Sequence, residues 1–237
     1  MSIRETIEQL KNEFSSALEQ NLPRFNRAIL RELDRLWSVA RSQGVTFEEF
    51  LASVERDLNL PGSAKLTIIN ELKTTQPAIR AAWDGYYKDT LAIDGLRGQD
   101  YARIIAETKI DYGTLQDDVR STLQTEVQKA INAKYGYEQL RGALRKEGFA
   151  EGRAKTLANT SLSQFDNAYN MEMAQQGGIE HFKYDGAINP NTRDFCRERV
   201  GTVFTLSQIM AMDNGQGLPV LTSLGGYNCT HFWTAVL

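Results

Sequence analysis

Apolar side chains recur at steps of three and four along most of the chain, which is the spacing of one face of an α-helix. The first stripe covers residues 1–43 and is interrupted at Pro23, so it predicts two helices, or one helix kinked near Leu22. Two interpretations of this long stripe are open. It packs on its own domain, or it binds a partner, with the side chains Phe14, Leu18, Phe25, Ile29 and Leu33 as the candidates.

Further helices follow the first stripe. Thr46-Phe47-Glu48-Glu49 is a capping-box pattern, which predicts a helix that begins there and runs to about Asn59. A proline usually begins a helix rather than continuing one, so Pro77 predicts a break after the preceding helical block. The same spacing predicts helices at about residues 63–73, 77–91, 99–105, 115–131, 138–146 and 153–176.

The pattern changes after the glycine pair at 177–178. Short alternating or aromatic-rich runs predict strands near residues 179–185, 201–204 and 229–236, with one or two helical turns between them. The glycines at 148 and 152 indicate a hinge. We therefore expect a mainly α protein with a small C-terminal α+β domain, divided into a helical region at 1–150 and an α+β domain at 151–237.

Composition adds a few exclusions. The chain has 237 residues, of which 41% are hydrophobic and 24% charged, as in ordinary globular proteins. A formal net charge of −3 argues against a strongly basic nucleic-acid binder but leaves a local basic patch open. No apolar run approaches the ~18–20 residues that span a bilayer, and no signal-peptide core follows the start. We expect no membrane partner and synthesis in a cytoplasm.

The C-terminal segment holds both histidines and both cysteines of the chain. His181, Cys196, Cys229 and His231 are the ligand types of tetrahedral zinc, although structural zinc sites usually begin with two cysteines two to four residues apart. Free or packed thiols, one disulfide and a bound metal are three open alternatives. If Cys229 and His231 lie on a strand, their side chains point to the same face.

Catalysis is the next alternative. Cys229 and His231 form no catalytic dyad by spacing alone, because a third group must orient the base; Asp194 is a candidate. Asn228, His231 and Asp194 also offer the residue types of a histidine-metal nuclease. The chain contains no Walker A, GxGxxG or HExxH pattern, and it lacks a basic surplus. We therefore do not expect an enzyme.

Three segments of the C-terminal third resemble the phage minor head proteins of the Mu F-like family, also called head morphogenesis proteins. Ala158-Asn159-Thr160-Ser161 with Tyr169-Asn170 is similar to the family's A-R-T-E…Y-N helix. Asn191 to Phe204 is similar to its D-x-R-T-R-x-x-C-x-x-x-x-G-x-V-F run. Gly225 to Trp233 is similar to its N-C-R-H ending, with Thr230 in place of the arginine.

The resemblance implies a structural minor head protein of a tailed bacteriophage, which acts in head morphogenesis and in DNA packaging or delivery. Residues 1–150 would engage the portal, scaffold or major capsid protein as an arm or bundle. Phage DNA is a further candidate partner. The protein would enter the virion head or neck in multiple copies after assembly in the host cytoplasm.

On this interpretation, the C-terminal domain is closed by a structural cluster rather than a catalytic one, and no cofactor is required, with zinc as the alternative. The expected members of the cluster are Asp194, Cys196, Asn228, Cys229 and His231. Two other functions remain open: a metal-dependent hydrolase or nuclease that uses the Cys/His cluster, and a DNA-binding accessory protein of the virion.

Overall fold

The protein is described by a computed structural model that covers residues 2–146, 148 and 151–236. The predicted fold class is confirmed, because the chain is helical up to residue 176 and forms a small three-stranded sheet afterwards. In chain order, the elements are α1 (Ile3–Ser42), α2 (Phe47–Asp57), α3 (Gly62–Leu91), α4 (Gly98–Glu107), α5 (Tyr112–Asn132), α6 (Tyr137–Lys146), α7 (Glu151–Gln176), β1 (His181–Asp185), α8 (Asp194–Arg197), β2 (Val203–Thr205), α9 (Leu206–Met210), α10 (Val220–Ser223) and β3 (Phe232–Ala235). The hinge predicted at 148–152 falls partly outside the described residues.

Two prolines lie inside helices that the sequence pattern divides. Pro23 lies within α1 and Pro77 within α3, so the prediction of separate helices at 63–73 and 77–91 is wrong, as is the two-helix alternative for residues 1–43. An interior proline removes one backbone hydrogen bond and costs about 3 kcal/mol. Apolar side chains buried on both sides of Pro77, including Ile68, Ile79 and Trp83, offset that cost.

The chain forms two compact units, each assembled from distant segments. The first unit contains Met1–Phe14, Leu72–Ile110 and Thr156–Leu237, and the second contains Ser15–Glu71 and Asp111–Lys155. Residues 1–14 are thus grouped with the C-terminal segment, while the division into 1–150 and 151–237 stays a prediction. We describe each unit by itself. Within the described residues, no helix is both long and apolar enough to cross a membrane.

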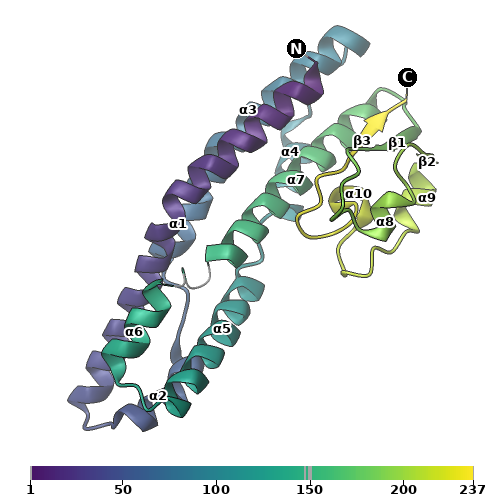
Figure 1. The fold of residues 1–237 in the computed structure, drawn as a ribbon. Coiled ribbons are helices and arrows are strands. Elements are labelled where there is room, and N and C mark those ends of the chain that lie inside the picture. The colour runs from purple at the N-terminus through teal and green to yellow at the C-terminus, as the bar shows by residue number, and fades with distance from the viewer. Residues whose placement is uncertain (1, 147, 149–150, 237) are drawn as a thin grey trace. The chain divides into compact units, whose positions relative to one another are not determined.

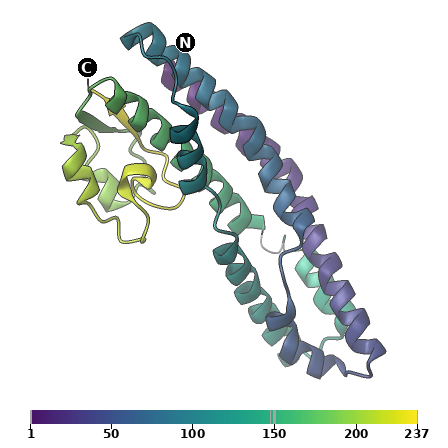
Figure 2. The ribbon, with the colours of Figure 1, turned by 180° about the vertical axis from the view of Figure 1, so that it is seen from behind.

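A buried carboxylate holds three segments of the first unit together. Asp166 on α7 is fully buried, and Lys11 Nζ on α1 lies 2.6 Å from its Oδ2. Trp83 Nε1 on α3 donates a hydrogen bond of 2.7 Å to its Oδ1, and Arg4 lies 3.7 Å from Oδ2. The N-terminal end of α1 follows the C-terminal part of α3 in both ribbon views (Figures 1 and 2). These contacts fix the start of the chain in this unit.

The sheet of the first unit is antiparallel, with β1 in the centre and strand order β2-β1-β3. In the register, Phe182 lies opposite Phe204 and Tyr184 opposite Trp233. Strand side chains alternate between faces, and Phe182, Tyr184 and Trp233 are fully buried on the face toward the core. The sheet lies beside α7 (Figure 1), where Asn170 donates to the carbonyl oxygen of Trp233.

The second unit has its own core. Thr46 and Glu49 form the predicted capping box at the start of α2. Trp37 on α1 stacks on Tyr137 of α6 and contacts two phenylalanines of α2. The carboxylate of Asp34 accepts hydrogen bonds of 2.7 Å from both Tyr137 and Arg141. These contacts hold α2 and α6 against α1.

The apolar stripe of α1 lies in the core of the chain itself. The five side chains that we considered for partner binding are at most 2% exposed: Phe14, Leu18, Phe25, Ile29 and Leu33. Packing on its own domain, the alternative interpretation of the stripe, is the arrangement found in the structure. A partner that contacts α1 here meets its polar, exposed face instead.

Candidate functional site

The candidate site lies in the first unit, where three segments meet. Cys196 is on the short helix α8, while Cys229 and His231 precede β3 in a segment without regular secondary structure. Tyr184 reaches the same place from β1. Its hydroxyl lies 3.2 Å from Cys196 Sγ and 4.0 Å from Cys229 Sγ. The fold therefore brings together side chains that are up to 47 positions apart, since Tyr184 and His231 mark the two ends.

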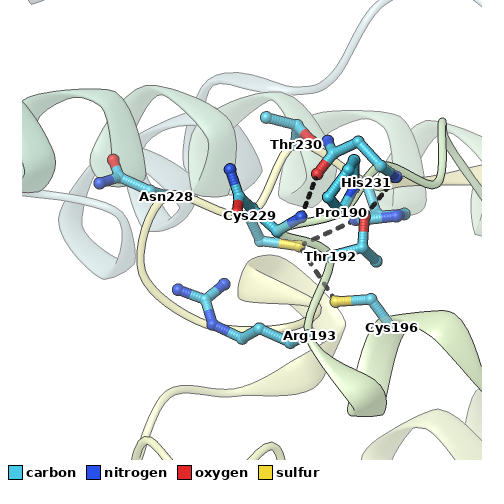
Figure 3. A pocket seen from close by; sticks show the side chains of 10 residues that line it. Pro190, Thr192, Arg193, Cys196, Asn228, Cys229, Thr230 and His231 are labelled. Carbon is cyan, nitrogen blue, oxygen red and sulfur yellow. Dashed lines mark hydrogen bonds between the residues drawn. The ribbon is translucent and has the colours of Figure 1, made fainter.

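The two thiols and the imidazole form a close group (Figure 3). The sulfur atoms of Cys196 and Cys229 are 3.8 Å apart, and Cys229 Sγ is 3.5 Å from His231 Nδ1. All three candidate ligand atoms lie within 4.8 Å of one another. Cys196 is 1% exposed, Cys229 9% and His231 5%, so the group is shielded from solvent.

Gly225 is required at its position by the two sulfur atoms. A Cβ there would overlap Cys196 Sγ and would lie 3.2 Å from Cys229 Sγ. The backbone N–H of Gly225 donates a hydrogen bond of 3.3 Å to Cys229 Sγ. A side chain at this position would therefore separate the thiols, and only glycine lets the backbone approach them.

The segment that carries Cys229 is fixed to α7 and α8. The backbone N–H of Asn228 donates to Thr160 Oγ1 at 3.1 Å, and its side-chain amide donates to Thr156 Oγ1 at 3.0 Å. The Arg193 guanidinium donates to the carbonyl oxygen of Tyr227 at 2.6 Å. Asn228 has a left-handed φ of 54°, which asparagine tolerates better than most residues.

The environment separates the pKa values of the two thiols. The hydrogen bond from the Cys196 thiol has the largest effect on the pKa of Cys229, which it lowers. Hydrogen bonds from His231 and the Gly225 N–H lower this pKa further, and together they outweigh burial, which would raise it. The same hydrogen bond, together with burial, raises the pKa of Cys196. Burial is also the main reason that the pKa of Tyr184 is raised. Cys229 is therefore the thiol that ionises first.

His231 has one ring nitrogen without a partner. Its Nδ1 faces Cys229, whereas the buried Nε2 has no hydrogen-bond partner among the described residues. No carboxylate orients the ring in the part of the chain that the structure describes. A buried polar atom normally forms a hydrogen bond to protein or to ordered water. We therefore expect Nε2 to bind a water molecule or another group from outside the chain.

A pocket of about 290 Å³ opens beside the thiols (Figure 3). Its lining includes Cys196, Cys229 and His231 together with Pro190 and Thr192 of the turn before α8. The group is thus shielded from bulk solvent and yet borders a space that can admit a small ligand.

The structure brings together three of the predicted site residues, places Asn228 beside them in the pocket lining and leaves two outside. His181 begins β1 and is exposed, because strand alternation points it away from the face that carries Tyr184. Asp194 is exposed at the start of α8 and does not orient a histidine, since a side chain two positions before Cys196 lies on another side of the helix. Asn228 lines the pocket, but its hydrogen bonds to Thr156 and Thr160 serve to hold the segment before β3 against α7.

Sequence reasoning missed Tyr184 and Gly225 as members of the site. Tyr184 and Phe182 share one face of a predicted strand, so the burial of Tyr184 could have been predicted. Its contact with the thiols could not. Glycine pairs are common in turns, so the sequence does not indicate that Gly225 lies against two sulfur atoms. The closing strand is shorter than expected, because β3 begins only at Phe232; Cys229 and His231 nevertheless share one side.

Comparison of the chain with protein-family models, curated proteins and solved structures gives no significant match.

Proposed function

We propose that this protein is a structural component of a tailed-phage head, and that its first unit is an assembly module closed by Cys196, Cys229 and His231. The proposal rests on the resemblance to Mu F-like minor head proteins. One structural observation supports it: the three segments that carry the resemblance are distant in sequence, yet they bond to one another.

The contacts among these segments are specific. Thr160 on α7 accepts a hydrogen bond from the backbone of Asn228, and Asn170 on α7 donates to Trp233. Between the second and third segments, Arg193 donates to Tyr227, and the two cysteine sulfurs are in contact. The three segments that carry the resemblance therefore hold one another in place. A chance likeness of separate short segments would not lead us to expect such contacts.

The surroundings of His231 favour architecture over hydrolysis. A cysteine nucleophile requires a base that is itself oriented by a third group. His231 has no such carboxylate among the residues described, and the thiols are buried. The chemistry-bearing side chains therefore serve better to join α8 to the segment before β3 than to attack a substrate.

A basic cluster in the second unit supports contact with phage DNA. Arg27, Arg31, Arg141 and Arg145 line a pocket of about 200 Å³ around Leu30. Arg141 is paired with Asp34, but the other three arginines form no ion pair within the described part of the chain. Unpaired arginines on adjacent helices are suited to phosphate groups. Despite the net charge of −3, this surface is locally positive.

Head association is tested by fractionating particles from cells that produce the phage. We expect the chain to sediment with heads at a fixed ratio to the major capsid protein, and to remain there after a high-salt wash. Recovery of the chain only among free soluble proteins, while heads assemble normally, would overturn the proposal.

The structure also changes which variants are informative. Deletion of residues 1–43 would remove Arg4 and Lys11 from the buried carboxylate Asp166, so the first unit itself would be damaged. Substitutions on exposed surfaces avoid this problem. Glutamate at Arg27 and Arg31 keeps the core intact and reverses the charge of the basic cluster.

A further inference from the structure

We propose that Cys196, Cys229 and His231 bind one zinc ion, with the fourth coordination position open toward the adjoining pocket. This inference goes beyond the structural role of the first unit, since neither head association nor DNA contact requires a metal.

Two of the three distances in the group match the edges of a zinc tetrahedron. With Zn–S bonds of ~2.3 Å and Zn–N bonds of ~2.0 Å, tetrahedral ligands lie about 3.8 Å apart for two sulfurs and about 3.6 Å apart for sulfur and nitrogen. The observed separations are 3.8 Å between Cys196 Sγ and Cys229 Sγ, and 3.5 Å between Cys229 Sγ and His231 Nδ1. Two of the three edges thus have the length that zinc requires, and the third pair, Cys196 Sγ and the His231 imidazole nitrogen, lies within 4.8 Å.

The outer contacts of the sulfurs are those that support thiolate ligands. Cys196 Sγ accepts a hydrogen bond from the Tyr184 hydroxyl at 3.2 Å, and Cys229 Sγ accepts one from the Gly225 N–H at 3.3 Å. Such donors stabilise the negative charge of a metal-bound sulfur and fix its position. Each sulfur therefore has its own donor from the surrounding protein.

Charge balance favours a divalent ion in this buried place. Two thiolates and a neutral imidazole around Zn²⁺ have no net charge, so the site can be buried at little cost. The same thiolates without a cation would be uncompensated charges in a site that is at most 9% exposed. Soft sulfur ligands with imidazole select zinc over magnesium or calcium, which prefer oxygen.

The number of protein ligands and the adjoining pocket point to a fourth ligand from outside the chain. His231 would bind the metal through Nδ1, which lies 3.5 Å from Cys229 Sγ, so its unpartnered Nε2 is not the metal-binding atom. The ligand set contains three residues rather than four, and all three line the pocket of about 290 Å³. A water molecule in that pocket would complete the tetrahedron, as in other three-ligand zinc sites.

A disulfide is the competing use of the same sulfurs. Bond formation would require two electrons to leave to an oxidant and the sulfurs to close from 3.8 Å to ~2.05 Å. Zinc binding and the disulfide exclude one another, because both consume Cys196 and Cys229. The experiment can therefore decide between them.

The test begins with the full chain, purified under reducing conditions without chelator, and with elemental analysis of the protein. We expect about one zinc per chain. Cys229→Ser and His231→Ala should lower zinc affinity at least tenfold, whereas His181→Ala, which removes the exposed histidine outside the group, should retain it. Replacement of zinc by cobalt should give the intense visible absorption of a tetrahedral site and a sulfur-to-metal charge-transfer band.

Gly225→Ala tests the geometry while keeping every ligand. The added Cβ would overlap Cys196 Sγ, so zinc affinity should fall at least tenfold. Gly142→Ala is the matched control, because a Cβ at Gly142 meets nothing within 4 Å and zinc binding should not change. Circular dichroism of each variant verifies that the helices remain folded.

Three outcomes would overturn the zinc site. The first is a folded chain that stays free of zinc after zinc is added, with both thiols reactive. The second is a Cys196–Cys229 disulfide in protein kept under reducing conditions. The third is unchanged zinc affinity in the folded His231→Ala variant. None of these outcomes would by itself exclude head association, so the two proposals fail independently.

Discussion

At the scale of single residues, the most consequential polar group outside the candidate site is the carboxylate of Asp166. It is fully buried on α7, and it is compensated by Lys11 and Arg4 from the start of the chain and by the indole N–H of Trp83. A buried charge is stable only if its partners remain. The N-terminal turns of α1 are thus part of the structural core of the first unit.

Replacement of Asp166 by asparagine should destabilise the protein by roughly 3–5 kcal/mol, because two cations lose their buried partner. Urea unfolding followed by circular dichroism measures the change. Asp89→Asn is the control, since Asp89 is exposed on α3, and its effect should stay within about 0.5 kcal/mol. Equal stability of the two variants would show that Asp166 does not hold the unit together.

The same carboxylate predicts a dependence of stability on pH. Burial, the largest single effect, would raise the pKa of Asp166, but Lys11, Arg4 and Trp83 outweigh it and the pKa is lowered. A carboxyl with a lowered folded pKa contributes stability above its unfolded pKa of ~3.9, and the contribution is lost as the pH falls through the folded value. The gap in unfolding free energy between the wild type and Asp166→Asn should therefore be constant near neutral pH and shrink below about pH 4. A gap that widens on acidification would contradict the assignment.

Part of this residue-level picture could be predicted from the sequence. Ligand types and the order of short motifs singled out Cys196, Cys229 and His231, and the structure brings these three together. The roles of Tyr184, Gly225 and Asp166 could not be predicted, because each depends on what lies across the fold. A local pattern shows that a residue is apolar or polar, but not which distant atom it meets.

At the scale of elements, periodicity predicted most helices and the three strands. It failed where a local rule was outweighed by packing, as at Pro23 and Pro77, which lie inside continuous helices. It also missed α10, a single turn in a glycine-rich loop that is too short for a periodic signal. Helical periodicity thus located most elements, and burial of apolar side chains kept α1 and α3 continuous across their prolines.

Pro77→Ala should stabilise α3. The substitution restores a backbone donor in the helix, a gain of up to ~3 kcal/mol, and loses about 0.4–1 kcal/mol because the unfolded chain becomes more flexible. Since Pro77 is exposed, little packing is lost, and we expect a net gain of about 1–2 kcal/mol. Pro61→Ala, just before α3, is the control and should give no gain in thermal unfolding. A destabilised Pro77→Ala variant would mean that the proline is required for the course of α3.

At the scale of the whole molecule, the two compact units are the feature that the sequence could not reveal. α1, α3 and α7 each contribute to both units, so the chain passes from one unit to the other inside three helices, and a fourth time in the connection between α4 and α5. Composition and glycine placement can indicate linkers, and in this sequence they indicate one at residues 148–152. They give no sign of a unit boundary inside a helix. The placement of the basic cluster in the second unit is likewise a product of the fold, since its arginines come from α1 and α6.

The basic cluster predicts salt-dependent DNA binding. Arg27→Glu combined with Arg31→Glu should weaken retention of duplex DNA and reduce its dependence on salt concentration, because fewer counterions are released. Lys73→Glu combined with Lys88→Glu is the matched control, with the same change in net charge at exposed positions of α3, and it should bind nearly as the wild type does. If both double variants lose binding equally, net charge alone explains the interaction and the cluster has no specific role.

Hydrogen exchange in the presence and absence of a zinc chelator tests most directly whether a metal at the cysteine–histidine group holds α8 and the segment before β3 together. Removal of the metal should accelerate exchange in residues 194–201 and 225–233 together, while α5 in the second unit stays protected. If those two segments exchange at the same rate with and without chelator, no metal joins them and the account of the zinc site is wrong.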